Sequence, residues 1–207
     1  MSLQKVQERF FAALKDLDSE TAEVVQRAYQ LAEREHEGQL RKEHKARPDD
    51  RDPYLIHPLR VSLILMSELR IADKTAISSA VLHDVVEDGN SRPTITDIRN
   101  EFGSEIAETV EYLTKPDEVD GIPHTPESLM PYHESFHHAP LHVRLVKLSD
   151  RLDNLRETLL VDRPKFQHRY LRETREVYLP LAAKTSLYFT EHLNDLCMRL
   201  ESMLVAQ

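Results

Sequence analysis

Tryptophan is absent from this 207-residue sequence, glycine occurs only four times, and Cys197 is the single cysteine. So little glycine disfavours a β-rich protein or a glycine-rich phosphate loop and favours a helical chain. A lone cysteine excludes an intramolecular disulfide and fits a reducing compartment. The sequence also lacks a signal-peptide core and any apolar run near the roughly 18 residues of a membrane span. We therefore expect a cytoplasmic protein with no membrane partner.

Positive charge is also in deficit, with a formal net charge of -9 and a pI near 5.7. This balance argues against a nucleic-acid partner. An acidic protein can still bind a small polyphosphate if a metal ion and a local basic cluster reverse the field at the site. The length suits one domain over residues 1–207. The oligomeric state is left open by the sequence.

Apolar residues recur at helical spacing along most of the chain, which predicts an all-α fold. Residues 1–20 predict a packing helix, and residues 141–159 carry a long leucine stripe. Asp73 is a candidate N-cap for a helix that runs to about Glu87. We expect irregular segments at 41–53 and 115–140, where prolines cluster.

The His83-Asp84 pair is the strongest chemical signal. Asp84 follows Ile77 and Ala80 at seven and four residues, so it continues the apolar face of its helix. A buried carboxylate is costly unless it is paired or bound to a metal ion. Glu87 lies one turn further on, beside Asp88, where either carboxylate can orient a water or move its proton.

Two further residues complete a candidate ligand set. Asp150 follows Val143 and Val146 at helical spacing and again takes the place of an apolar residue. His57 precedes Pro58, which predicts an N-cap position for His57 and a restricted backbone for a fixed ligand. Two histidines and two aspartates suit Mn²⁺, Fe²⁺, Co²⁺ or Zn²⁺ better than Ca²⁺.

Each of these residues alone is more often structural, and an isolated His-Asp pair is a weak signal. Together, in the order His, His-Asp, Asp, they indicate a metal centre. The basic cluster Arg41, Lys42 and Lys45 is either a solvated helix end or a phosphate clamp. A histidine-rich segment favours an exposed loop over a second metal site; its histidines are His133, His137, His138 and His142.

Five segments taken together resemble the hydrolase domain of the RelA/SpoT homologues. They are HEGQLRK with PYLIHPLRV, AVLHDVVEDG, FGSEIAETVEYLTK and RLVKLSDRLDNLRETL. The resemblance covers roughly residues 29–183. No synthetase segment follows, which points to the small alarmone hydrolases, similar to the metazoan SpoT homologue.

The resemblance implies a bundle of about ten helices with a central metal cleft, and a Mn²⁺-dependent (p)ppGpp 3′-pyrophosphohydrolase. Pyrophosphate and GDP or GTP would be released through attack of a metal-activated water. The implied ligands are His57, His83, Asp84 and Asp150, and the implied acidic pair is Glu87 and Asp88. Arg41 and Lys42 match residues near the nucleotide and phosphates, and Asn154 matches one near the ribose.

The chain departs from the family pattern in two places. Asp153 stands where long relatives commonly carry histidine, and Glu157 where many carry threonine, both close to the expected ribose pocket. The segment 115–140 has few basic residues, for which Arg169 and Arg172 are candidate substitutes. The alternatives are therefore an HD phosphohydrolase acting on NADPH 2′-phosphate, an adenosine alarmone or a nucleoside 5′-phosphate, and a non-catalytic nucleotide-sensing domain.

Overall fold

A computed structural model describes residues 1–41, 51–116, 124–125 and 127–205. These residues form twelve α-helices and no strand, with one isolated bridge between Leu40 and Pro53. Two of the helices, α5 and α11, have only four and five residues. The predicted all-α bundle of about ten helices is therefore confirmed. The helices are α1 (Leu3–Leu14), α2 (Ser19–Glu35), α3 (Ile56–Leu63), α4 (Lys74–Leu82), α5 (Val85–Asp88), α6 (Ile95–Phe102), α7 (Ser104–Leu113), α8 (Met130–Ser135), α9 (Leu141–Thr158), α10 (Pro164–Glu173), α11 (Leu179–Ala183) and α12 (Leu187–Val205).

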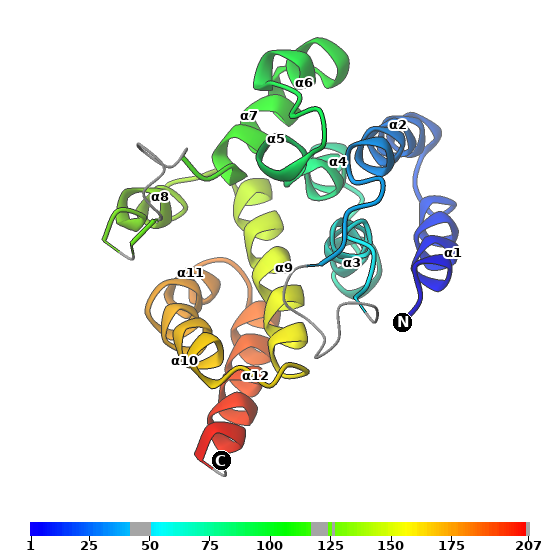
Figure 1. Ribbon diagram of the computed structural model, residues 1–207. Coiled ribbons are helices and arrows are strands. Elements are labelled where there is room, and N and C mark those ends of the chain that lie inside the picture. The colour runs from blue at the N-terminus through cyan, green and yellow to red at the C-terminus, as the bar shows by residue number, and fades with distance from the viewer. Residues whose placement is uncertain (42–50, 117–123, 126, 206–207) are drawn as a thin grey trace.

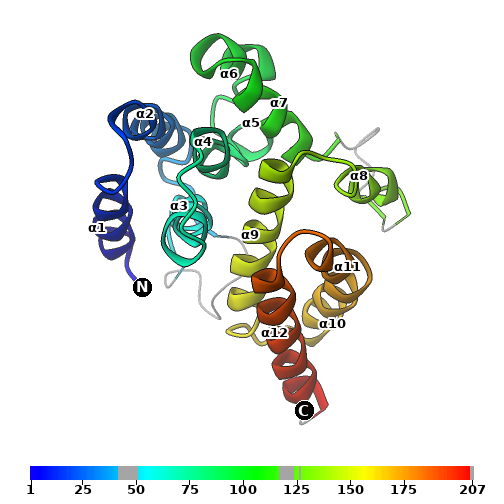
Figure 2. The same cartoon turned by 180° about the vertical axis from the view of Figure 1, so that it is seen from behind.

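Helix α9 runs through the middle of the molecule (Figure 1). It contacts α3, α4 and α7 on one side and α10 and α12 on the other. The view from behind shows the same division, with α1 to α4 gathered on one side of α9 and α10 to α12 on the other (Figure 2). Side chains of α9 can therefore reach both halves of the bundle.

Two apolar clusters form the core. One joins the N-terminal helices through residues such as Phe10, Ile56 and Val81, which are fully buried. The other joins α9 to the C-terminal helices through residues such as Leu152 and Phe189, which are also fully buried. Helices α3 and α4 contribute to both clusters. Polar residues at the junction of α3, α4 and α9 are thus enclosed by packed apolar side chains.

Helix ends follow the signals in the sequence where a capping side chain is present. The Asp73 carboxylate accepts a hydrogen bond from the Ala76 amide at 2.7 Å, as predicted for the N-cap of α4. Thr94 and Asp97 form a reciprocal capping box at the start of α6. Gly103 ends that helix with φ at +89°, a conformation that glycine adopts without steric cost.

Two predicted helix boundaries are wrong, and both concern candidate ligands. The helix expected to run to Glu87 ends at Leu82, and His83 and Asp84 form a turn before α5. The His83 ring bonds the Ala80 carbonyl at 2.9 Å and so competes with the helical backbone for that acceptor. His57 is not an N-cap but the second residue of α3. Pro58 is tolerated there because proline lacks a backbone N–H, and N–H groups in the first turn of a helix have no partner within the helix.

The remaining expectations about chain organisation are met in part. Helix α8 lies inside the segment 115–140, which was expected to be irregular. Leu141, at the start of the predicted leucine stripe, is 53% exposed, whereas Leu148, Leu152 and Leu155 are fully buried. Among the described residues, none of the helices has the length and hydropathy needed to cross a membrane.

Candidate metal centre and substrate cavity

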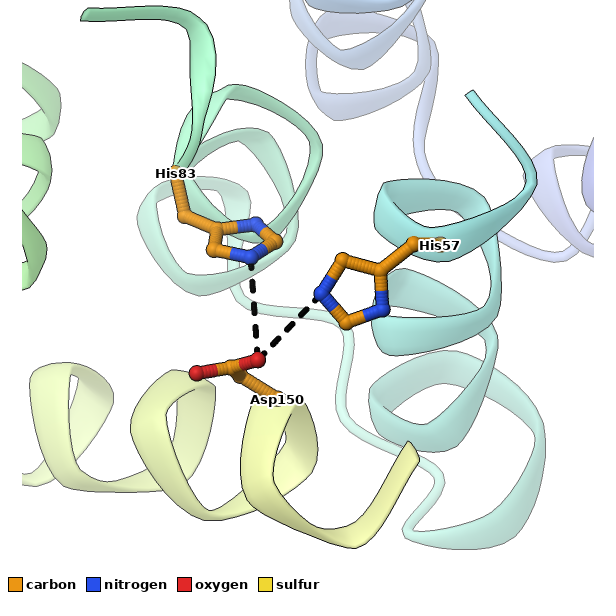
Figure 3. A group of neighbouring side chains, drawn as sticks. All are labelled: His57, His83 and Asp150. Atoms are coloured by element: carbon orange, nitrogen blue, oxygen red, sulfur yellow. Dashed lines mark ion pairs between the residues drawn. The ribbon is translucent and has the colours of Figure 1, made fainter. Parts of the chain in front are cut away.

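Three buried side chains from three segments of the chain meet at one point. His57 comes from the first turn of α3, His83 from the turn that follows α4, and Asp150 from the middle of α9 (Figure 3). Their ligand atoms lie within 4.8 Å of one another. The Asp150 Oδ1 atom is 3.2 Å from His57 Nε2 and 3.9 Å from His83 Nε2. The predicted residues are thus brought together although 93 positions separate the first from the last.

Asp84 joins this group from the turn between α4 and α5. Its Oδ2 atom lies 3.3 Å from His83 Nε2 and 3.8 Å from His57 Nε2. The Tyr54 hydroxyl donates to the same oxygen at 2.7 Å. All four residues of the predicted ligand set therefore face one small volume.

Hydrogen bonds on the far side of each ring suit the histidines to metal binding. Ring nitrogen Nδ1 of His83 lies 2.9 Å from the Ala80 carbonyl, and Nδ1 of His57 lies 2.7 Å from Asp153 Oδ2. A proton on each Nδ1 leaves the Nε2 lone pair facing the two carboxylates. Within the described part of the chain, His83 Nε2 is buried and has no hydrogen-bond partner. A divalent cation between these atoms would satisfy it, so the donor set fits a metal ion.

The charges at this point are strongly coupled. Burial opposes ionisation of Asp84, but the nearby His83 and His57 outweigh it and hold the pKa of Asp84 well below its usual range. Burial likewise disfavours charge on Asp150, but Lys147 and His57 outweigh burial and hold the pKa of Asp150 well below its usual range. The Lys147 Nζ atom is 3.1 Å from Asp150 Oδ2. Both carboxylates are therefore ionised and able to act as ligands at neutral pH.

The pKa of His57 is shifted in the opposite direction. Burial and the charge of Arg41 oppose its protonation, but hydrogen bonds to Asp150 and Asp153 raise its pKa to about 9. A metal ion at Nε2 would replace one proton, because only the unprotonated nitrogen can act as a ligand.

A cavity of about 860 Å³ opens onto the four predicted ligands. Its volume is in the range of small-molecule sites. The wall also includes Lys115, Lys147 and Arg151, so the cavity carries basic side chains although the protein as a whole is acidic. Arg169 and Arg172, the candidate substitutes for a basic loop, also line it.

Glu87 and Asp88 both line this cavity from α5. The Lys115 Nζ atom donates to Glu87 Oε1 at 2.8 Å, and the Lys115 amide donates to Oε2 at 3.2 Å. Asp88 Oδ2 lies 3.1 Å from the Tyr54 hydroxyl, which also contacts Asp84. The acidic pair therefore lies on the short helix that directly follows Asp84, and both carboxylates line the cavity.

Arg41 and Asn154, two of the predicted substrate-binding residues, meet at another part of the wall. Arg41 Nη2 donates to Asn154 Oδ1 at 2.8 Å and to Glu157 Oε2 at 2.8 Å. Asn154 Nδ2 in turn donates to Asp150 Oδ1. Lys42, the third predicted substrate-binding residue, lies outside the described residues, as does Lys45.

The two departures from the family pattern lie in one buried ionic network. Asp153 was expected near the ribose pocket, but its carboxylate contacts His57 and Arg60 behind the ligands. Glu157 forms ion pairs with Arg60 and Arg41. The helical periodicity gave no sign of this network, because its partners are more than 90 positions apart.

Several site residues were not singled out from the sequence. Tyr54 stands three residues before His57, in the turn that leads into α3, and this spacing was its available signal. Lys147 lies three residues before Asp150 on α9 and contacts its carboxylate. Of the clustered histidines, His133 lines the cavity and lies 3.7 Å from Glu173. The one group of metal-ligand type found among the described residues is His57, His83 and Asp150.

Comparisons with known proteins agree with this geometry. The model of the HD domain family matches residues 28–187. A guanosine-3′,5′-bis(diphosphate) 3′-pyrophosphohydrolase from Aquifex aeolicus is 37% identical over 169 residues, which cover 81% of this chain and 22% of that protein. A GTP pyrophosphokinase from Streptomyces coelicolor is 36% identical over 172 residues, which cover 83% of this chain and 19% of that protein. The chain therefore spans about a fifth of the length of these curated relatives.

A solved structure gives a match over nearly its whole length. It is described as a metazoan orthologue of SpoT that hydrolyses ppGpp and plays a role in starvation responses. The TM-score is 0.73 at 25% identity, and the match covers 85% of this chain and 94% of the other. The match to the family model covers well over half of the chain, including every candidate ligand. This chain belongs to the HD domain family, and its relatives include SpoT-like hydrolases.

Proposed function

We propose that this chain is a Mn²⁺-dependent (p)ppGpp 3′-pyrophosphohydrolase, which releases pyrophosphate and leaves GDP or GTP. The observation that carries the proposal is one cavity lined by the four candidate ligands, the acidic pair, and the Arg41–Asn154 pair. The relatives support it, because the Aquifex protein is named for this reaction and the metazoan orthologue hydrolyses ppGpp. The proposal includes a cytoplasmic location.

The proposed ligands are His57, His83, Asp84 and Asp150. When bound, a divalent ion would lower the pKa of a coordinated water and polarise a phosphoryl oxygen. The mixed nitrogen and oxygen donors suit Mn²⁺ among other transition metals. The ionised carboxylates hold negative charge at the centre, and the Nδ1 hydrogen bonds fix the direction of both rings.

Glu87 and Asp88 are the proposed proton acceptors. In hydrolysis the water oxygen bonds to the phosphorus attached to the 3′ oxygen, and the bond from phosphorus to that oxygen breaks. One proton leaves the water, and the 3′ oxygen gains one. The two carboxylates face the cavity close to the candidate ligands, and the Lys115 ammonium group donates a hydrogen bond to Glu87.

Arg41 and Lys42 are proposed to bind phosphate oxygens, and Asn154 to bind the ribose. Arg41 is 7% exposed, and its guanidinium is held by Asn154 and Glu157, so its direction is set before substrate binds. The proposed role of Lys42 rests on the sequence resemblance alone.

A panel of nucleotides tests this function. The Mn²⁺-loaded chain is given ppGpp, pppGpp, an adenosine alarmone, NADPH and nucleoside 5′-phosphates, and the products are separated by anion exchange. We expect the highest kcat/KM for the guanosine alarmones, with pyrophosphate and GDP formed in equal amounts from ppGpp. Faster cleavage of another nucleotide would instead support an HD phosphohydrolase with that substrate. Tight Mn²⁺ binding without turnover of any nucleotide would favour a non-catalytic sensing domain.

A further inference from the structure

Asp153 lies directly behind His57, on the side away from the other candidate ligands. Its Oδ2 atom is 2.7 Å from His57 Nδ1, and the two side chains are 3% and 1% exposed. Asp153 follows Asp150 by three residues on α9, so one helix supplies both the carboxylate in front of the ring and the one behind it. The ring is therefore held from two sides by α9.

Arg60 keeps the Asp153 carboxylate in place. Its Nε atom donates to Asp153 Oδ1 at 2.8 Å and its Nη2 atom to Oδ2 at 3.0 Å. Arg60 is three residues after His57 on α3, so this bidentate pair also ties α3 to α9. Such a pair has a fixed geometry and compensates the buried negative charge of Asp153.

The two histidines differ in what orients them. Nδ1 of His83 bonds a backbone carbonyl three residues earlier in its own chain segment, a contact that no side-chain substitution at the acceptor removes. Nδ1 of His57 bonds a carboxylate on another helix. Loss of that carboxylate would free the His57 ring to turn and would allow its proton to move to Nε2, the atom that faces Asp150 and Asp84.

We propose that Asp153 is a positioning residue for the metal centre: it accepts the Nδ1–H of His57 and so holds Nε2 toward the ion. Hydrogen bonds of this kind orient histidine ligands and raise their basicity, and their loss costs about 10- to 100-fold in metal affinity. The inference rests on the proposed metal centre but not on the identity of the nucleotide.

Calorimetric titration with Mn²⁺ in the absence of nucleotide tests the proposal on four proteins: wild type, Asp153→Ala, Asp153→Asn and Glu157→Gln. Asp153→Ala should bind Mn²⁺ about 10- to 100-fold more weakly. Asp153→Asn should retain most of the affinity, because its amide oxygen can still accept the Nδ1–H. Glu157→Gln is the matched control: it removes a carboxylate from the Arg60 and Arg41 side of the same network and should leave Mn²⁺ affinity unchanged.

A second measurement separates orientation from general loss of structure. Ring ¹⁵N shifts of His57 in the Zn²⁺-loaded protein should report a protonated Nδ1 and a metal-bound Nε2 in the wild type and in Asp153→Asn. Equal Mn²⁺ affinity in Asp153→Ala and wild type would overturn the proposal, as would an equal loss in Glu157→Gln. If Asp153→Ala does not fold, a wild-type spectrum in which His57 binds Zn²⁺ through Nδ1 would overturn it. Because no nucleotide is present, failure to cleave ppGpp would leave these results intact.

Discussion

The Tyr54 hydroxyl joins the candidate metal centre to the acidic pair, since it lies 2.7 Å from Asp84 Oδ2 and 3.1 Å from Asp88 Oδ2. The phenol ring is fixed by its neighbours. It stacks on His36 with ring centroids 4.6 Å apart, and the Arg41 guanidinium lies 5.3 Å from its centroid. Burial and the two carboxylates raise the pKa of Tyr54 well above its usual range, so the hydroxyl keeps its proton and acts as a donor.

Tyr54→Phe tests this link. The substitution keeps the ring and removes the donor, so Asp84 loses a contact that orients it. We expect Mn²⁺ affinity or kcat to fall about 10- to 100-fold, the usual cost of losing such an outer hydrogen bond. Metal titration and initial rates on ppGpp measure the two effects separately. Wild-type values for both would mean that the hydroxyl does not orient Asp84.

Glu87→Gln tests the proposed proton acceptor. The amide keeps the size of the side chain but cannot take a proton from water. We expect kcat to fall about 10²- to 10⁴-fold, the range for loss of a general base, while Mn²⁺ affinity stays at the wild-type value. Rates on ppGpp at saturating Mn²⁺ provide the measurement. Full kcat in the variant would remove Glu87 from the proposed mechanism.

Three of the four candidate ligands could be predicted from apolar periodicity, because Asp84 and Asp150 each interrupt an apolar helical face and His83 stands beside Asp84. His57 was instead inferred from its position before Pro58, and the N-cap predicted for it was wrong. Asp84 and Asp150 occupy positions where the periodicity calls for apolar residues, and the structure brings both to one point. Periodicity describes a single helix. It could therefore not reveal Asp153 behind His57, a contact between side chains 96 positions apart.

The turn at His83 also lay beyond pattern reasoning. The spacing of Ile77, Ala80 and Asp84 in the sequence is the same whether the helix continues through His83 or is interrupted there. This spacing could therefore not distinguish the two structures. What distinguishes them is the bond from the His83 ring to the Ala80 carbonyl, which depends on the direction of one side chain.

Leu152→Ala tests the packing of α9, the helix that carries Asp150. Leu152 is fully buried in the C-terminal core cluster. Removal of its isobutyl group should lower the free energy of unfolding by about 2–5 kcal/mol, because a cavity remains. Leu160→Ala is the matched control, since Leu160 is 80% exposed and its loss should cost no more than about 0.5 kcal/mol. Urea denaturation of both variants gives the comparison, and similar values would contradict the burial of α9.

Glu68→Gln tests a pH dependence of stability. Arg156 donates to both Glu68 oxygens, at 2.9 and 2.8 Å, and lowers the pKa of Glu68 below its ordinary value of 4.5. A lowered folded-state pKa adds stability above pH 4.5 that is lost as the pH falls through the folded-state value. The side chains are 33% and 36% exposed, so solvent screening limits the effect to about 0.5–1 kcal/mol.

Denaturation of wild type and Glu68→Gln at pH 7 and pH 3 measures this contribution. The wild type should be the more stable protein at pH 7, and the difference should shrink at pH 3 as Glu68 becomes protonated. A difference that is equal at both values would show that the ion pair does not depend on the charge of Glu68.

The most direct test of the central claim is pyrophosphate release from ppGpp after EDTA treatment, followed by titration with Mn²⁺. Wild type, Asp84→Ala and Asp195→Ala are compared, the last being a control at an exposed carboxylate on α12. We predict that release requires Mn²⁺, is retained in Asp195→Ala and is lost in Asp84→Ala. Release that persists without the metal ion, or in Asp84→Ala at the wild-type rate, would contradict the account.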